Sequence, residues 1–249
     1  MVRLSIVTLL GFLACGGEAA MEPDGAVQPD VDAASVSTFP TPGFGSITGD
    51  CNVLDDELLL QAPALLRSSF NFDRMYEDAD LSMLSTGGQQ IVADGNAGGS
   101  SVLSEVFAFE MLARCESAAL LKTETNIDYD TEGKLTDFLA DIDSEKIGVS
   151  VTRAVAFPFD DPYEVTQAAE LLQDKLSDVL ESSANVGAED RWQKQILAIL
   201  AYSPGHADAI AEAWMNLDAE TRADTIVHVM VTNGQDDFIY CDGVCPTGR

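Results

Sequence analysis

The spacing of hydrophobic residues divides the second half of the chain into helices and strands. In some segments apolar residues recur every third or fourth position, and in others they alternate with polar residues or run continuously. The pattern predicts helices at 102–115, 162–183 and 205–217, strands at 118–129, 134–142, 147–157 and 195–202, and a C-terminal β-hairpin of 225–232 and 237–241 around an Asn233-Gly234 turn. This order is typical of an α/β domain in which helices flank a mixed central sheet.

The segments nearer the N-terminus are less regular. Residues 55–67 have helical spacing that Pro63 interrupts, so we expect a short helix there. Residues 15–44 are rich in Pro, Ala, Asp, Ser and Gly and have few large apolar side chains, which is typical of a flexible linker. Residues 45–249 are long enough for one sizeable core and are expected to form a single domain.

The chain begins with the pattern of an export signal. Arg3 precedes an apolar run at 4–14, which is too short to cross a bilayer and is followed by small residues. A signal peptide is therefore expected at 1–14. Later apolar stretches are all broken by charges within a few positions, so we expect no membrane-spanning helix after it.

The end of this run predicts how the protein is held outside the cytoplasm. Phe12-Leu13-Ala14-Cys15 resembles a bacterial lipobox, with Phe12 in the place of the usual Leu. The resemblance implies that Cys15 carries a lipid and that residues 15–44 tether the domain to a membrane. Gly16 after the cysteine favours the outer membrane or the cell surface. The alternative is secretion, with cleavage near residues 18–20 and loss of Cys15.

Charge narrows the range of partners. The chain contains 42 Asp and Glu but 13 Lys and Arg, and its formal net charge of −29 is spread along its length. Such a surface opposes non-specific attraction to nucleic-acid phosphates and suits solubility or divalent cations. His206 and His228 are the two histidines, which excludes His-rich metal sites. Aromatic residues do not cluster with basic ones, so nothing indicates sequence-specific nucleic-acid recognition.

Four cysteines lie in the expected domain, and an even set in an exported chain favours disulfides. Cys241 and Cys245 are close enough in sequence to close a small loop, and Cys51 would then pair with Cys115. Other pairings stay open. A zinc site at Cys241 and Cys245 is the rival interpretation, but no second ligand pair and no neighbouring His accompany them.

Two predicted elements carry carboxylates in a familiar order. Glu105 lies on helix 102–115 and is followed by Ala108 and Leu112, and Asp137 has apolar neighbours in strand 134–142. With the order helix, three strands, helix and strand over about residues 100–203, they resemble the core of the PD-(D/E)xK nuclease-like superfamily. The resemblance implies a restriction-endonuclease-like core in which Glu105 and Asp137 hold Mg²⁺ or Mn²⁺. The other interpretation of Asp137 is a capped or solvent-facing carboxylate.

The third strand departs from the superfamily pattern. The superfamily places an acidic residue and a Lys two positions apart on this strand, where this chain has Ser150 and Thr152. Some members carry a functional residue on the following helix instead, where Lys175, or Glu170 one turn before it, could serve. The alternative is that Lys175 belongs to a solvated helix face. Arg153 and Lys194 are further cations for which no specific argument exists.

Two functions therefore stay open. In the first, which the missing motif and the net charge favour, the nuclease-like domain has lost catalysis and acts in binding or scaffolding. In the second, it is a divalent-metal-dependent nuclease with relocated catalytic residues, and nucleic acid is then its partner. A cation beside Glu105 and Asp137 would favour the enzyme.

Overall fold

The computed structural model describes residues 38–97, 102–159 and 161–241. They belong to one compact unit that extends from Val36 to Arg249. The expected signal peptide at 1–14, Cys15 and Cys245 lie outside the described residues, so what was expected of them stays a prediction. Among the described helices, none is both long and apolar enough to cross a membrane.

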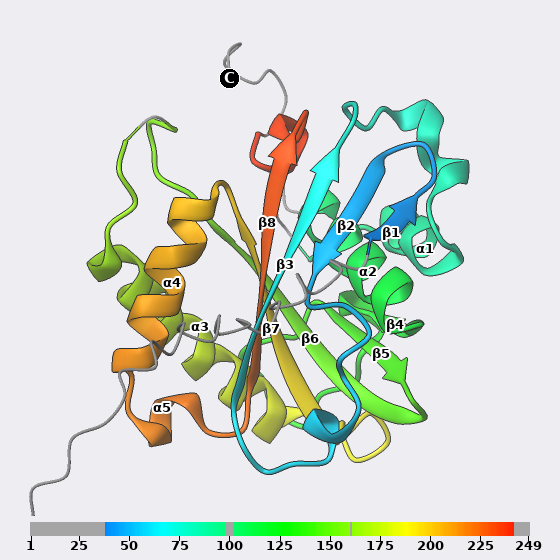
Figure 1. Cartoon of the computed structure of the whole chain (residues 1–249). Helices are drawn as coiled ribbons and strands as arrows, with labels where there is room; N and C mark the ends of the chain where they lie inside the picture. Colours follow the sequence, from blue (N-terminus) through cyan, green and yellow to red (C-terminus); the bar gives the residue numbers. More distant parts are fainter. Residues whose placement is uncertain (1–37, 98–101, 160, 242–249) are drawn as a thin grey trace, which may run out of the picture. The chain divides into compact units, whose positions relative to one another are not determined.

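Eight strands form one mixed sheet (Figure 1). The strands are β1 (Thr38–Thr41), β2 (Gly45–Gly49), β3 (Ala64–Phe72), β4 (Ala119–Thr123), β5 (Phe138–Ile142), β6 (Glu145–Ala154), β7 (Lys194–Ala201) and β8 (Ile226–Gly234). Their order across the sheet is β1-β2-β3-β8-β7-β6-β5-β4. The four middle strands, from β3 to β6 in this order, are parallel, and the strands on either side of them are antiparallel.

Helices cover both faces of this sheet (Figure 1). The α-helices are α1 (Thr86–Asp94), α2 (Val102–Cys115), α3 (Val165–Asn185), α4 (Pro204–Asn216) and the short α5 (Ala219–Arg222). Short 3₁₀-helices are η1 (Asp56–Leu58), η2 (Asp78–Met83), η3 (Glu124–Asn126) and η4 (Asp237–Ile239). Helices α1 and α2 lie on one face, whereas α3 and α4 lie on the other.

Alternation along the strands divides the apolar side chains between two cores. All eight residues of β7 are buried. Ile196 and Ala198 join the core beneath α2, while Leu197 and Ile199 join the core beneath α3 and α4. The continuous apolar run of β7 follows from its position in the parallel part of the sheet, where helices cover both faces.

The predicted core order is confirmed. Helix α2 is followed by β4, β5 and β6, then by α3 and β7. Strands β4, β5 and β6 form an antiparallel meander, and β7 returns parallel to β6. The chain therefore has the mixed α/β architecture expected from its pattern, and this arrangement sets the start of β5 beside β6.

The predicted C-terminal hairpin is wrong. Strand β8 continues through Asn233 and Gly234, which pair with Asn71 and Phe72 of β3. The next residues form the 3₁₀ turn η4 instead of a second strand. Asn-Gly is a strong local turn signal, but here parallel pairing with β3 satisfies the backbone of β8 to its end.

Two predictions near the N-terminus also need correction. The helix expected at 55–67 is the 3₁₀ turn η1 followed by β3, because Pro63 stands directly before a strand that the sheet recruits between β2 and β8. The linker expected at 15–44 is too long, since β1 begins at Thr38 and Phe44 is buried in the core beneath α2.

The predicted Cys51–Cys115 disulfide is present, with the two Cα atoms 4.8 Å apart. It joins the segment after β2 to the end of α2. Glu116 strengthens this junction, because its carboxylate accepts hydrogen bonds from the backbone N–H groups of Asn52, Val53 and Leu54 at 2.7, 3.3 and 3.1 Å. Burial raises the pKa of Glu116, and these N–H groups oppose the increase.

Of the two cysteines in the second predicted disulfide, one lies among the described residues. Cys241 is disulfide-bonded, and its expected partner, Cys245, lies outside the described residues. The zinc alternative for this pair therefore does not apply to Cys241 in this structure, because a cysteine in a disulfide has no thiolate to bind a metal.

Candidate functional site

Asp137 lies directly before β5, not in the middle of a strand as predicted. Its backbone N–H donates to the Val149 carbonyl (3.1 Å), and its Oδ2 accepts the N–H of Val151 (2.7 Å). The strand begins later than predicted because the preceding N–H, that of Thr136, donates to Tyr129 Oη (2.7 Å) and not to a neighbouring strand. Both bonds of Asp137 hold its carboxylate against β6.

A polar cleft of about 380 Å³ opens at this position. It lies between the segment that leads into β5, the middle of β6 and one side of α3. Five of its lining residues are charged, and the full lining is Glu124, Gly133, Lys134, Leu135, Asp137, Ser150, Val151, Lys175 and Asp178. The cleft therefore gathers side chains from segments that are far apart in the sequence, as functional sites commonly do.

The pKa of Asp137 reports how its neighbours act on it. Burial raises this pKa to about 8, and the negative charge of Glu105 adds to the increase. The N–H of Val151 lowers it, Glu124 raises it further, and the positive charge of Lys175 lowers it. Glu105 and Lys175, the other predicted site residues, thus both act electrostatically on Asp137, in a pattern that functional sites often share.

Glu105 is the carboxylate of α2 that is coupled to Asp137. It is buried, and its Oε1 accepts a hydrogen bond from Asn96 Nδ2 (2.8 Å). Glu110, on the same helix, has a structural role: it accepts bonds from the Ser85 N–H (2.7 Å) and from Arg114 Nη2 (2.6 Å). These contacts fix the start of α1. Glu105 itself does not line the Asp137 cleft, so its role as a site residue stays a prediction.

Lys175 lies on α3 and lines the cleft together with Asp137 and Ser150. Its Nζ is 3.6 Å from Asp178 Oδ2, and Nζ of Lys134 is 2.9 Å from Oδ1 of the same carboxylate. The two lysine side chains are 40% and 52% exposed, so each ammonium group can turn toward a ligand. Ser150 offers a hydroxyl where the superfamily has an acid.

The other two cations have structural positions. Arg153 Nη1 donates to the Ile239 carbonyl (3.2 Å). Lys194 is fully buried, and its Nζ donates to the carbonyls of Leu60 and Ala62, the latter at 3.0 Å. Neither residue lines the Asp137 cleft. Among the three cations considered from the sequence, Lys175 is therefore the one that lies beside Asp137.

Glu124 is a cleft residue that the sequence analysis did not single out. It begins η3 directly after β4, and its Oε2 accepts the N–H of Ala97 (2.7 Å). Its negative charge contributes to the raised pKa of Asp137. The available signal was an acidic residue at the end of the strand that precedes the Asp137 segment, but one acid among 42 does not stand out.

The donor set fits a hard divalent cation. Mg²⁺ prefers oxygen ligands and is commonly held by one or two carboxylates, with substrate phosphate and water completing the shell. Glu105 and Asp137 are two such carboxylates, and no described residue donates a hydrogen bond to Oδ1 of Asp137. No group of three or more His, Cys, Asp or Glu in the described part of the chain has metal-binding geometry. The cation would thus depend on substrate and water for further ligands.

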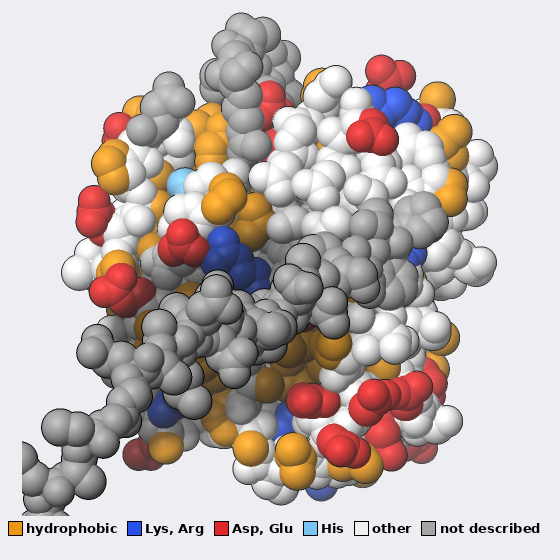
Figure 2. Space-filling model, in the orientation of Figure 1, with side chains coloured by type: hydrophobic (Ala, Val, Ile, Leu, Met, Phe, Trp, Pro, Cys, Tyr) orange, Lys and Arg blue, Asp and Glu red, His pale blue; other side chains and the backbone are white. Residues whose placement is uncertain are grey.

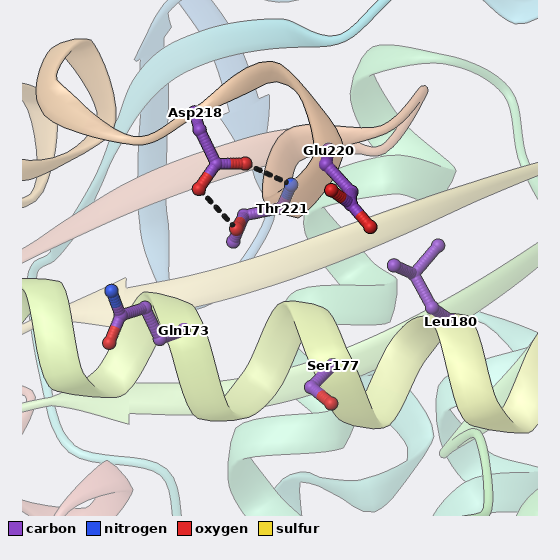
Figure 3. Close-up of a pocket in the computed structure, with 6 residues that line it drawn as sticks. All are labelled: Gln173, Ser177, Leu180, Asp218, Glu220 and Thr221. Carbon is purple, nitrogen blue, oxygen red and sulfur yellow. Dashed lines mark hydrogen bonds between the residues drawn. The ribbon is translucent and has the colours of Figure 1, made fainter.

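A second groove lies between α3 and α5 (Figure 3). Asp218, the N-cap residue of α5, points to Thr221 on the same side of the groove, and the N–H and Oγ1 of Thr221 donate to its carboxylate at 2.7 and 3.1 Å. These bonds cap the short helix α5 and lower the pKa of Asp218. The described lining comprises Gln173, Ser177, Leu180, Asp218, Glu220 and Thr221. It has neither a cation nor a coupled carboxylate pair, so the Asp137 cleft is the better candidate.

Comparisons with known proteins find a relative that matches part of this chain and a solved structure that is distantly similar to it. No family model matches the chain. The AAC-rich mRNA clone AAC4 protein of Dictyostelium discoideum is 41% identical over 153 residues, which are 59% of this chain and 22% of that protein. The chain thus matches about one fifth of the relative's length, and the relative's name states no activity.

Among solved structures, the chain is similar to Pyrococcus furiosus SfsA in complex with Ca²⁺. The TM-score is 0.30 and the sequence identity 12%, over 52% of this chain and 55% of that chain. A likeness of this degree supports no argument about ligand or activity. The assignment of the site therefore rests on the geometry of the Asp137 cleft.

Proposed function

We propose that this domain is a divalent-cation-dependent phosphodiesterase of the nuclease-like type, with one catalytic group relocated. The observation that carries the proposal is the shared cleft, since Asp137 and Lys175 line it together and the charge of Glu105 acts on Asp137. Lys175 on α3 takes the role of the Lys that is absent from β6. This observation reverses the preference for a non-catalytic domain that the missing motif and the net charge had suggested.

Each residue has a distinct role in this proposal. Glu105 and Asp137 would hold Mg²⁺ or Mn²⁺. When bound, such a cation lowers the pKa of water and stabilises negative charge on a transferring phosphate. Lys175 would bind a non-bridging phosphate oxygen through its ammonium group, and the Ser150 hydroxyl would donate a further hydrogen bond.

A non-catalytic binding or scaffolding domain is the second candidate. The observation that favours it is the pair Ser150 and Thr152 on β6, because the acid of that motif has no replacement on the same strand. In this case the cleft would retain a divalent cation or a ligand without hydrolysing it. Both candidate functions predict that the cleft binds a divalent cation, but only the enzyme is expected to hydrolyse a substrate.

The test of the enzyme uses residues 36–249, which contain the whole compact unit. After treatment with a chelator, Mn²⁺ binding is measured by calorimetry, and hydrolysis is measured on DNA, RNA and a chromogenic phosphate diester. Glu105→Gln is expected to weaken cation binding at least about 10-fold and hydrolysis roughly 100-fold. Glu212→Gln, an exposed change on α4, is the matched control and should alter neither.

The outcomes separate the candidates. Hydrolysis that requires the cation and is lost in Glu105→Gln supports the enzyme. Cation binding with no hydrolysis of any substrate supports the binding domain instead. If the wild type neither binds Mn²⁺ nor hydrolyses any of the three substrates, the proposed site is wrong.

We further propose that the protein is exported and held to a membrane by a lipid on Cys15. The Cys51–Cys115 disulfide supports export, because structural disulfides persist in oxidising compartments. In the source cells, labelled palmitate should be incorporated into the wild type but not into Cys15→Ala, and the variant should leave the membrane fraction. Equal labelling of the two proteins, or unchanged membrane retention of the variant, would contradict the anchor.

A further inference from the structure

We infer that the substrate of the Asp137 cleft is a small phosphate diester and not a nucleic-acid polymer. This inference rests on the proposed phosphodiesterase function and concerns the size of what the site accepts. Three features of the described residues carry it: the engagement of the basic side chains elsewhere in the fold, the distribution of charge on the surface, and the composition and volume of the cleft.

Most basic side chains are already engaged within the fold. Of the 13 Lys and Arg, Arg3 and Arg249 lie outside the described residues, which leaves eleven. Four of these form ion pairs at 2.6 Å, and Lys134 and Lys175 share Asp178 at the cleft. The four pairs are Arg67 with Asp208, Arg74 with Asp80, Arg114 with Glu110 and Lys122 with Asp190.

The remaining described cations do not form a surface track either. Lys194 is buried, Arg153 and Lys146 donate to backbone carbonyls, and the Arg222 guanidinium lies over the Trp214 ring. The eleventh, Arg191, is exposed and does not line the Asp137 cleft. On the face drawn in Figure 2, Lys and Arg side chains form a few separate spots among Asp and Glu. A protein that follows a nucleic-acid backbone needs a continuous positive groove.

Repulsion by the whole protein grows with the number of phosphates in the substrate. Duplex DNA carries one negative charge per about 1.7 Å of its axis, whereas a small diester carries one in total. Because the chain has a net charge of −29, each additional phosphate of a polymer outside the cleft meets a negative surface. A single phosphate inside the cleft also meets Lys134 and Lys175, which line it together with the carboxylates of Glu124, Asp137 and Asp178.

The cleft itself is suited to one small anionic group. Its volume of about 380 Å³ is near the lower end of the range for small-molecule sites, roughly 300–1,000 Å³. Lys134 and Lys175 approach the same Asp178 carboxylate, so an entering phosphate can replace that carboxylate as their partner. Leu135 adds an exposed apolar surface against which an organic substituent of the ester can pack.

The reaction needs no reactant besides water. The oxygen of water forms a new bond to phosphorus, and one phosphorus–oxygen ester bond breaks. One proton of the water moves to the leaving alkoxide, which departs as an alcohol, and the other stays on the new phosphate oxygen. The products are one phosphate monoester and one alcohol, and no electrons are exchanged with a cofactor.

The experiment compares substrate size with residues 36–249 and Mn²⁺. The dinucleotide thymidylyl-thymidine, which has one diester bond with the same alkoxide leaving group, is compared with duplex DNA and single-stranded RNA at equal concentrations of diester bonds. We expect hydrolysis of the small diester to be at least about 10-fold faster per bond than that of either polymer. Its rate should change less than about 2-fold between about 50 and 200 mM salt, where polymer binding through several phosphates would fall steeply.

Substitution of the two lysines tests the cleft itself. Lys134→Gln combined with Lys175→Gln should raise KM for the small diester about 10-fold or more, because both ammonium groups would contact its phosphate. Lys146→Gln, the same change at a lysine outside the cleft, is the matched control and should leave KM unchanged. An unchanged KM in the double variant overturns the assignment of the phosphate to these lysines.

Failure of this inference differs from failure of the proposed function. Faster hydrolysis of DNA or RNA than of the small diester overturns the small-substrate inference and leaves the phosphodiesterase intact. Absence of hydrolysis of all three substrates, with no Mn²⁺ binding, overturns the phosphodiesterase and the inference with it. Preferential hydrolysis of the small diester, with the expected effect of the lysine changes, supports both.

Discussion

Replacement of Asp137 by Asn is expected to lower cation-dependent phosphodiester hydrolysis roughly 1,000-fold, about 4 kcal/mol of transition-state stabilisation. The amide retains an oxygen that can accept the Val151 N–H, so the contact with β6 is preserved. What it loses is the negative charge that would hold the cation with Glu105. Initial rates with the small diester and calorimetric Mn²⁺ binding measure the two effects together.

The same substitution should change how stability depends on pH. The raised pKa of Asp137, about 8, means that the folded protein keeps this proton over a range in which the unfolded chain, with an ordinary pKa of 3.8, has lost it. Without divalent cations, the free energy of unfolding should therefore fall as pH rises from about 4 to about 8. Asp137→Asn has no carboxyl group to titrate and so avoids this decrease in the free energy of unfolding. The melting temperature of the variant should therefore exceed that of the wild type at about pH 9.

A matched change and an added cation make this prediction specific. Glu212→Gln alters an exposed carboxylate on α4 outside the Asp137 cleft and should change neither hydrolysis nor the pH dependence of melting. Mn²⁺ should raise the melting temperature of the wild type at high pH, because it binds the ionised carboxylate, but not that of Asp137→Asn. A wild-type melting temperature that is unaffected by Mn²⁺ would contradict the assignment of Asp137 as a ligand.

Removal of the Cys51–Cys115 disulfide should have the second large effect. The two cysteines are 64 positions apart, and a cross-link over a loop of that length lowers the entropy of the unfolded chain by an amount worth about 4 kcal/mol. Cys51→Ser combined with Cys115→Ser should therefore lower the free energy of unfolding by about this amount. Glu116 keeps its bonds to residues 52–54, so the folded arrangement of the segment should be retained.

Urea unfolding of the double variant and the wild type measures this difference. Cys241→Ser is the comparison, because Cys241 is also disulfide-bonded and its predicted partner, Cys245, would close a much shorter loop. The entropic effect grows with loop length, so Cys241→Ser should cost clearly less. If both variants lose equal stability, or the double variant loses none, chain entropy is not what the Cys51–Cys115 bond contributes.

Local patterns predicted the core of the fold because its elements are decided by burial. The continuous apolar run of β7 requires cover on both faces, and the apolar stripe of α3, which includes Leu172 and Leu176, requires a sheet beneath it. Local patterns failed where the sheet supplied a partner that the sequence does not reveal. Asn233 and Gly234 carry a turn signal, yet pairing with β3 keeps them in β8.

Some residues of the candidate site were likewise predicted from the sequence, and others were not. Asp137 was predicted because a carboxylate among apolar neighbours is costly unless a partner compensates it, whereas Glu105 was predicted from its resemblance to a superfamily motif. The charge of Glu105 does act on Asp137. Glu124 was not predicted, since nothing in the sequence distinguishes it from the other acidic residues. It reaches the cleft because η3 follows β4 at the edge of the meander.

By itself, the sequence determined the order of the core elements, because that order follows from hydrophobic periodicity. It suggested the Cys51–Cys115 pair but left other pairings open. It suggested Asp137 from the cost of burying charge, and Glu105 from the resemblance to a superfamily motif. The tertiary structure alone decided which of the candidate cations lies beside Asp137. Lys175 reaches the cleft because α3 packs over β6, whereas Arg153 and Lys194 are held by backbone carbonyls elsewhere. Such proximity depends on how distant segments pack, and no local pattern encodes it.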